Sequence, residues 1–179
     1  MKSERGFSLV ELLIVLALIG IVIPLGYMFF SYGYRTFIRG EQQAIAQQSI
    51  RTGAEFITSE IRFADKLILN PENISESGYF YFTLENGSLL YYYVDPNNNK
   101  THEITVLDSA ADNIDYNVFF QEALVADQFE YKVVVLFSIQ AENNLYTLDT
   151  NVSILNLIDQ DHYSIEGGSS NSIKFQKPF

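Results

Sequence analysis

The chain has 179 residues, enough for one ordinary domain, and 47% of them are apolar, too many for a disordered polypeptide. It carries 11 Lys and Arg against 22 Asp and Glu, a formal net charge of −11, which argues against broad nucleic-acid binding because that depends on basic side chains displacing phosphate counterions. It contains no cysteine, which excludes disulfides, thiolate metal sites and a catalytic thiol.

The first predicted element is a membrane-spanning helix. Residues 7–34 contain one charged side chain, and residues 12–30 are 19 consecutive uncharged residues. As a helix this run is about 28 Å long, close to the hydrocarbon thickness of a bilayer. A helix in the core of a soluble domain would show a polar face, and a secretory signal would be shorter and would end in small residues. We therefore predict that the helix inserts into a membrane and that any cleavage falls before it, after Gly6.

Glu11 is the single charge in this segment. A carboxylate inside a membrane helix costs roughly 2.5–3.5 kcal/mol and usually has a partner. No Lys or Arg lies at helical spacing within the apolar run, but cleavage after Gly6 would create an amino group at Phe7, on the same chain or on a neighbouring subunit. Alternatively, Glu11 lies at the membrane interface, where the dipole of a helix N-terminus favours a negative charge. The residues alone leave both interpretations open.

The segment 2–13, KSERGFSLVELL, resembles the class III signal of type IV pilins and type II secretion pseudopilins. Its features are a short basic leader, a Gly-Phe junction, a Glu at the fifth position after the junction, and an apolar helix. The resemblance implies that a prepilin peptidase removes the leader, residues 1–6, by cleaving between Gly6 and Phe7, and that Phe7 is N-methylated. It also implies that Glu11 pairs with the N-terminus of a neighbouring subunit during assembly.

The same resemblance implies the partners and the location. Expected partners are other pilins or pseudopilins through their N-terminal helices, an inner-membrane assembly platform, and membrane lipid before assembly. The implied location is the bacterial cytoplasmic membrane, crossed once with the head outside the cytoplasm, and then a pilus or pseudopilus at the cell surface. Basic residues flank both ends of the apolar helix, residues 7–34, so charge alone does not decide its orientation.

Pro24 lies inside the apolar helix. Proline removes a backbone donor and clashes with the preceding turn, so the sequence predicts a kink or local melting there. In the pilin family such a proline accompanies loosening of the helix in filaments. A proline that is merely tolerated in a membrane helix is an equally good interpretation.

Residues 35–70 predict an amphipathic continuation of the helix, because apolar residues from Ala46 to Ile68 recur at spacings of three or four. Asn70-Pro71 predicts its end. The expected fold is α+β, with the second half of the long helix packed on an antiparallel sheet of four or more strands in a head formed by residues 71–158. Residues 159–179, rich in Ser, Asn and Gly, predict an irregular or loosely docked tail.

The head predicts two hairpins. Asn86-Gly87 lies between two aromatic runs and predicts a type I′ turn, and residues 141–144 predict a second connection. In the second hairpin, Val135 and Phe137 mark one face of a strand and Leu136 the other. Strands are expected at 79–84, 89–94, 104–107, 114–121, 129–140 and 145–155.

Two downstream segments carry a second resemblance. Residues 48–64 and 145–156 are similar to the helix after the anchor and to a late strand in J-type minor pseudopilins and related minor pilins. Major pilins often carry a loop closed by cysteines, which this cysteine-free chain lacks.

No motif for catalysis, metal or cofactor is found. The two histidines, His102 and His162, have no metal-ligand spacing. We therefore expect no enzyme activity and no cofactor, and interpret the chain as a minor pilin or pseudopilin subunit of a type IV pilus or type II secretion pseudopilus. Two alternatives are a subunit of a competence pseudopilus for DNA uptake and a plain single-pass membrane protein whose Gly6-Phe7 junction is accidental.

Overall fold

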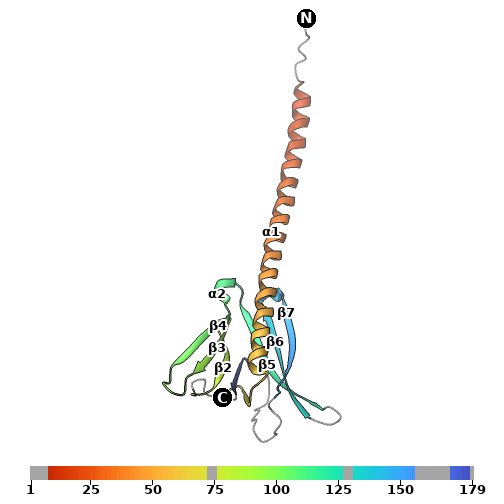
Figure 1. The fold of residues 1–179 in the computed structure, drawn as a ribbon. Helices are drawn as coiled ribbons and strands as arrows, with labels where there is room; N and C mark the ends of the chain where they lie inside the picture. The colour runs from red at the N-terminus through yellow and green to blue at the C-terminus, as the bar shows by residue number, and fades with distance from the viewer. Residues whose placement is uncertain (1–7, 72–75, 127–130, 156–169, 178–179) are drawn as a thin grey trace. The chain divides into compact units, whose positions relative to one another are not determined.

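The computed structural model describes residues 8–71, 76–126, 131–155 and 170–177. It divides into two units, Met1–Glu41 and Gln42–Phe179. Helix α1, Leu9–Ile61, contributes its first part to one unit and its last part to the other (Figure 1).

In the first unit, α1 is an apolar helix with an exposed surface. Within the described residues it is the one helix long and apolar enough to cross a membrane, and none of that apolar window is buried. Its large apolar side chains are exposed: Phe29 is 77% exposed and Leu13 59%. The helix continues through Pro24, so the kink or melting expected there stays a prediction.

In the second unit, the last part of α1 buries one stripe. Its buried residues are Ala46, Ile50, Gly53, Ala54, Ile57 and Ile61. This is the amphipathic pattern expected from the sequence, up to the point where the helix ends.

The predicted extension of the helix to residue 70 is wrong. The helix ends at Ile61, and Lys66–Leu69 form strand β1, in which Leu67 and Leu69 are buried. A two-residue spacing of buried side chains is the period of a strand, and a partner strand supplies the backbone hydrogen bonds. The apolar residues in this stretch fit both the helical spacing of three or four residues and the two-residue spacing of a strand. Pairing with a distant strand therefore decided that they form a strand.

The larger sheet has five antiparallel strands in the order β1-β8-β2-β3-β4. Its remaining strands are β2 (Phe80–Glu85), β3 (Ser88–Val94), β4 (Thr101–Leu107) and β8 (Ser172–Gln176). Asn86 and Gly87 between β2 and β3 have φ angles of 49° and 75°, so the predicted turn with two positive φ angles is confirmed.

The smaller sheet has the order β5-β6-β7. Its strands are β5 (Tyr116–Ala126), β6 (Tyr131–Ala141) and β7 (Thr147–Ser153), with a short 3₁₀ turn η1 (Glu142–Asn144) between the last two. Val135 and Phe137 are buried and Leu136 is exposed, as their alternation predicted. The second predicted hairpin is thus confirmed.

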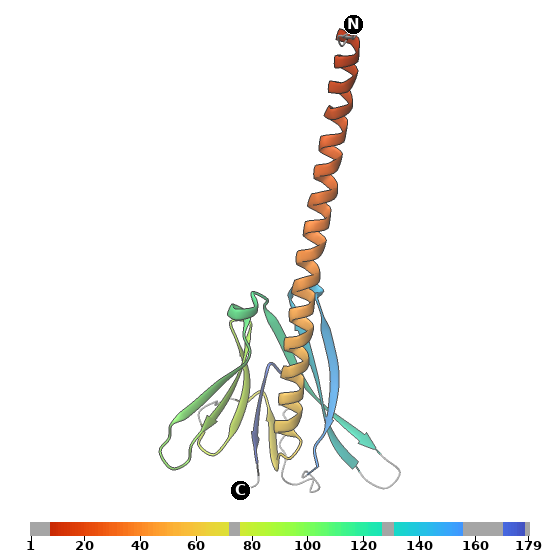
Figure 2. The same cartoon turned by 45° about the horizontal axis from the view of Figure 1, so that its top comes forward.

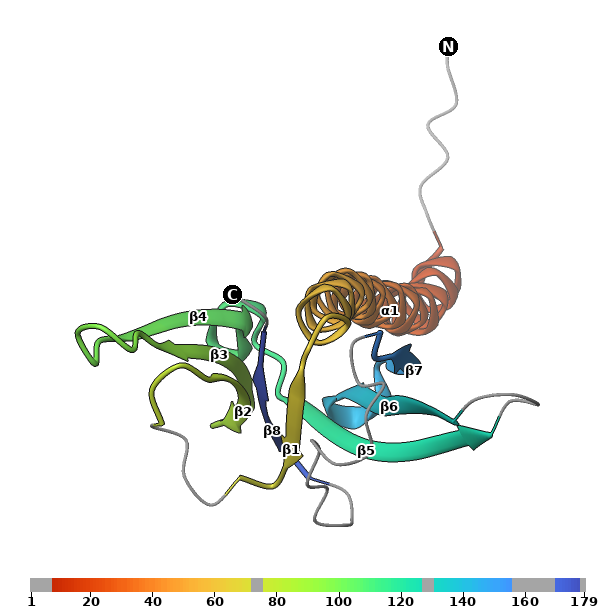
Figure 3. The same ribbon diagram turned by 60° about the horizontal axis from the view of Figure 1, so that its bottom comes forward.

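The expectation of a single sheet is corrected, although the α+β class with antiparallel strands is confirmed. A short helix α2, Ser109–Asp112, separates β4 from β5, and no ladder joins those two strands. Asp108 caps α2 by accepting hydrogen bonds from two backbone N–H groups, which stabilises the change of direction. Figure 3 shows the two sheets on either side of the last turns of α1.

The expectation of an irregular C-terminal tail is also wrong where the structure describes it. Strand β8 lies between β1 and β2 (Figure 2), and Ile173 and Phe175 are fully buried. Ser170 also pairs with Phe120 of the smaller sheet. The polar composition of the tail obscured a five-residue strand with two apolar residues on one face. Residues 159–169 of the predicted tail lie outside the described residues.

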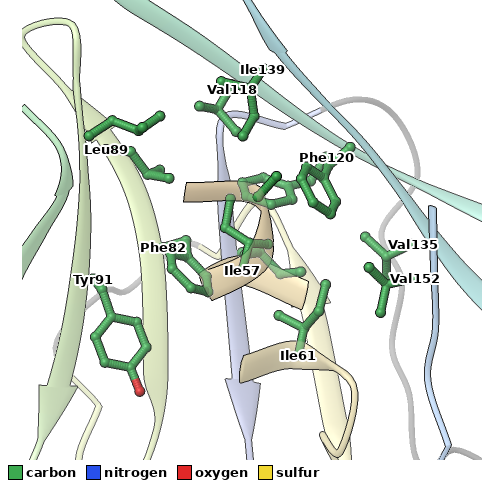
Figure 4. Close-up of a cluster of buried hydrophobic side chains, with 14 of the residues drawn as sticks. Ile57, Ile61, Phe82, Leu89, Tyr91, Val118, Phe120, Val135, Ile139 and Val152 are labelled. Carbon is green, nitrogen blue, oxygen red and sulfur yellow. The ribbon is translucent and has the colours of Figure 1, made fainter. Parts of the chain in front are cut away.

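The core of the second unit lies where the helix meets both sheets. Aromatic rings from neighbouring strands stack, as Phe80 does on Tyr93 at 4.5 Å and on Phe175 at 5.6 Å between ring centroids. The aromatic residues of β2 and β3 thus pack across neighbouring strands. Figure 4 places Ile57 and Ile61 of α1 among side chains of both sheets, including Phe82, Tyr91, Val135 and Val152.

Candidate functional site at the start of the helix

Ser8 begins helix α1. Its carbonyl oxygen accepts a hydrogen bond from the N–H of Leu12 at 3.2 Å, and its Oγ accepts from the N–H of Val10 at 3.4 Å. A serine in this position satisfies a backbone donor that the helix leaves without a partner.

Glu11 completes the other half of this cap. Its Oε2 accepts a hydrogen bond from the backbone N–H of Ser8 at 3.0 Å. Serine at the cap and glutamate three residues later form the capping-box pattern, and a carboxylate in the first turn also interacts favourably with the helix dipole, by about 0.3–1 kcal/mol. Glu11 is therefore a helix-start carboxylate, and its location at a membrane interface, the alternative interpretation from the sequence, stays a prediction.

The other interpretation, a pairing with a free amino terminus, involves residues that the structure does not describe. Gly6 and Phe7 both lie outside the described residues. Within the described part of the chain, Glu11 forms no ion pair, in agreement with the absence of Lys and Arg from the apolar run in the sequence. Its carboxylate is exposed, so a partner that carries positive charge can reach it.

The surface beyond Glu11 is the second component of the site. Every described residue from Leu9 to Phe30 is exposed, so the whole circumference of the helix is apolar and uncovered. Removing such an apolar surface from water is favourable by about 25 cal/mol per Å². Only lipid or other apolar helices can cover it on all sides. The site is therefore an apolar rod with one carboxylate at its start.

The second unit contains ion pairs that tie its C-terminal segment to the rest. Glu60 near the end of α1 accepts hydrogen bonds from the hydroxyl of Tyr91 and from Nζ of Lys177, the latter at 2.6 Å. Burial, followed by this contact with Glu60, raises the pKa of Tyr91 above its ordinary range. The ammonium of Lys177 also lies 4.8 Å from the centroid of the Phe80 ring. These contacts hold the chain after β8 against the helix.

A second ion pair lies on the outer face of the five-stranded sheet. Lys174 of β8 is almost completely buried and pairs with Glu76, and its Nζ lies 4.1 Å from the centroid of the Tyr79 ring. Tyr81 beside it exchanges hydrogen bonds with the backbone of Glu76. Burial raises the pKa of Tyr81 to about 12. All of these polar groups are satisfied, which is the pattern of a structural contact.

A centre for metal or acid–base chemistry is not found in the described residues. No group of three or more His, Asp or Glu side chains there could hold a metal ion. His102 is exposed on β4 and stacks on Tyr93 with ring centroids 6.3 Å apart. His162 lies outside the described residues.

Sequence reasoning singled out Glu11 and missed Ser8. The signal was present, because Ser8-Leu9-Val10-Glu11 matches the serine-x-x-glutamate pattern that precedes an apolar run. The ion pair between Glu60 and Lys177 joins residues 117 positions apart in the sequence, and no local pattern indicates it.

Comparisons with known proteins agree with this geometry. Residues 1–23 match the model of the prokaryotic N-terminal methylation motif. Among solved structures, the PilB minor pilin from Streptococcus sanguinis matches with a TM-score of 0.55 and 11% identity, over 74% of this chain and 34% of that one. A point mutant of the same protein matches with a TM-score of 0.53 and 10% identity, over the same shares. A comparison with curated proteins finds no match.

The matched region is thus about a third of the PilB minor pilin, and the likeness at this identity shows the fold. The chain has the long N-terminal helix and antiparallel sheets of a minor pilin. The resemblance to the type IV pilin family drawn from the N-terminal residues is confirmed by the methylation motif and by this fold.

Proposed function

We propose that this chain, with the N-terminal methylation motif of prokaryotic pilins on a minor-pilin fold, is a non-catalytic subunit of a type IV pilus or type II secretion pseudopilus. A prepilin peptidase removes residues 1–6, Phe7 is N-methylated, and the subunit assembles through α1. The observation that carries the proposal is an apolar helix, exposed on every side, with a single carboxylate at its start.

The exposed apolar surface of the helix explains how the subunit can lie first in the membrane and then in a filament. Before assembly, lipid of the cytoplasmic membrane covers the helix, which crosses once with the head outside the cytoplasm. During assembly, the helices of other pilins replace the lipid, and the chain becomes part of a filament at the cell surface. Because both environments are apolar, the exchange needs little net hydrophobic energy. An inner-membrane platform can therefore drive it.

Glu11 supplies selectivity in this exchange. Its carboxylate accepts one backbone hydrogen bond and has no cation in the described part of the chain. Leader removal creates an ammonium at Phe7, four residues earlier in the sequence. The ammonium of a neighbouring subunit has the complementary charge and lies at the corresponding end of a parallel helix. In an apolar filament core such a pair is strongly favoured over an unpaired carboxylate.

Substitution of Glu11 tests the proposal. We expect Glu11→Ala to be inserted into the membrane and processed normally but to be strongly reduced in sheared filaments, because the N-terminus of the neighbour loses its counter-charge. Ser8→Ala is the matched control. It removes the side-chain cap but leaves both the Ser8 backbone N–H and the Glu11 carboxylate, so incorporation should stay near normal. Equal amounts of the unsubstituted and Glu11→Ala chains in filaments would contradict the role of the charge pair.

A further inference from the structure

Two grooves of opposite charge lie on opposite flanks of the last part of α1. One, of about 430 Å³, lies between the helix and β7 and is lined by Arg51 and Arg62, with Glu55 between them. The other, of about 470 Å³, lies between the helix and the end of β4 and is lined by Asp108 and Asp112. We refer to them as the basic groove and the acidic groove.

The helix geometry places the grooves on different sides. Arg51, Glu55 and Arg62 follow one another at four and seven residues, so they form a single stripe beside the three-stranded sheet. Ile45 and Ser49, four residues apart, form another stripe beside β4. Each groove borders the last strand of its sheet, because β7 and β4 are edge strands. In the part of the chain that the structure describes, both flanks are therefore open to a neighbouring molecule.

Within the described residues, the charges in the grooves are not neutralised by ion pairs. In the part that the structure describes, neither Arg51 nor Arg62 forms an ion pair. Asp108 accepts hydrogen bonds from two backbone N–H groups of α2, and Asp112 accepts one from the hydroxyl of Tyr116, so neither faces a cation. The basic groove, with two arginines and one glutamate, has an excess of positive charge in a chain of net charge −11.

We propose that the two grooves are the two halves of one head-to-tail contact, in which the acidic flank of a second copy of this chain faces the basic groove. This inference rests on the proposed function, because assembly through α1 holds the helices of neighbouring copies parallel. The contact is between different surfaces of identical chains, so in a pair of copies each copy still has one unoccupied groove, the acidic groove on one copy and the basic groove on the other. Such a contact does not close on itself and propagates as an open helical polymer.

The positions of the grooves also give the stagger of the two copies. The basic groove is lined by residues about eight positions further along α1 than the acidic groove. At 1.5 Å per residue, this offset is about 12 Å along the helix axis. When the acidic groove of the second copy faces the basic groove of the first, the two parallel copies are therefore displaced by about 12 Å along the helix axis. The second copy is shifted toward the C-terminal end of α1.

The strength of the contact determines the assay. Exposed ion pairs are individually weak and are screened by salt, so the grooves alone are not expected to form dimers of free subunits. The contact becomes significant when the N-terminal helices already hold the chains side by side. It must therefore be measured in assembled filaments.

The absence of cysteine makes engineered disulfides a direct probe. Two differently tagged full-length copies are expressed together, one with Ser59→Cys in the basic groove and one with Ala111→Cys in α2, between the two aspartates. Sheared filaments are then oxidised. We expect the mixed cross-link, and no Ser59→Cys homodimer.

Charge reversal tests the electrostatic part. Arg51→Glu with Arg62→Glu on the first copy should lower the mixed cross-link about tenfold, and Asp112→Lys on the second copy should restore much of it. The matched control reverses two exposed lysines outside the grooves, Lys66→Glu with Lys100→Glu, and should leave the yield unchanged.

Each remaining outcome has a defined meaning. A yield insensitive to charge reversal, or a Ser59→Cys homodimer, would overturn the paired grooves. Filaments that contain the chain without any mixed cross-link would overturn the contact between copies but leave the proposed function standing. Absence of the unsubstituted chain from filaments would contradict the proposed function itself.

Discussion

Replacement of Phe175 by alanine is the most informative perturbation of the head, because the composition of the C-terminal segment gives no hint of a core residue there. Phe175 lies in β8, has no exposed surface, and pairs in register with Leu67 of β1 and Phe80 of β2. Its ring stacks on those of Phe80 and Phe82 at centroid distances of 5.6 and 5.7 Å. Removing it opens a cavity at the centre of the five-stranded sheet.

The expected loss can be estimated from these contacts. Truncation of a buried phenylalanine costs about 3–5 kcal/mol, and the site leaves little room for collapse because β1 and β2 are held on both sides of β8. A domain with a typical stability of about 5–15 kcal/mol would lose a large fraction of it. Gln176→Ala is the matched control, since Gln176 is the next residue of the same strand and is only half-buried.

Urea unfolding of the full-length chain in detergent measures both variants. The chain has 12 tyrosines and no tryptophan, so the near-ultraviolet signal of tyrosine reports packing of the head. We expect Phe175→Ala to unfold at a much lower urea concentration and Gln176→Ala to differ from the unsubstituted chain by about 0.5 kcal/mol or less. A loss below about 1 kcal/mol for Phe175→Ala would refute the placement of β8 in the core.

Two further predictions concern the same head. Because burial raises the pKa of Tyr81 to about 12 from its ordinary value of 10.0, the folded chain keeps a proton that the unfolded chain releases. The contribution of Tyr81 to the free energy of unfolding should therefore be constant below pH 10 and fall as the pH rises toward 12. The fall in stability should be smaller in Tyr81→Phe when urea midpoints at pH 9 and 11 are compared. Gly87→Ala should cost about 1–3 kcal/mol, because φ is +75° and an added Cβ would lie 2.5 Å from Oδ1 of Asp115. Gly78→Ala, with φ +81° and open space around the Cβ, should cost less in thermal unfolding, and equal costs would contradict the clash.

Periodic patterns and turn chemistry predicted a large part of the fold. The spacing of Ala46, Ile50, Ile57 and Ile61 identified the buried stripe of α1, and Asn86-Gly87 located the β2–β3 hairpin. These signals are local, because a helix face and a type I′ turn are each determined within a few residues. Glu11 was identified for a similar reason, as a charge in a segment that otherwise has none.

The errors concern pairing between distant segments. In the local sequence, Leu67 and Leu69 are compatible with the end of a helix. In the folded chain they form a strand because they pair with β8, which lies more than 100 residues later in the sequence. In the same way, Ile173 and Phe175 become core residues only because β1 and β2 leave a gap of one strand. The charged grooves beside α1 combine side chains of the helix with residues of β4, α2 and β7, so no single stretch of sequence contains them.

The mass of the N-terminus decides whether the leader is removed and Phe7 is methylated. The chain is purified from membranes of cells that contain an active prepilin peptidase and is analysed by mass spectrometry of its N-terminal peptide. We expect a chain that begins at Phe7, lacks residues 1–6, and carries a methyl group on its α-amino nitrogen. An intact N-terminus at Met1 in those cells would contradict this expectation.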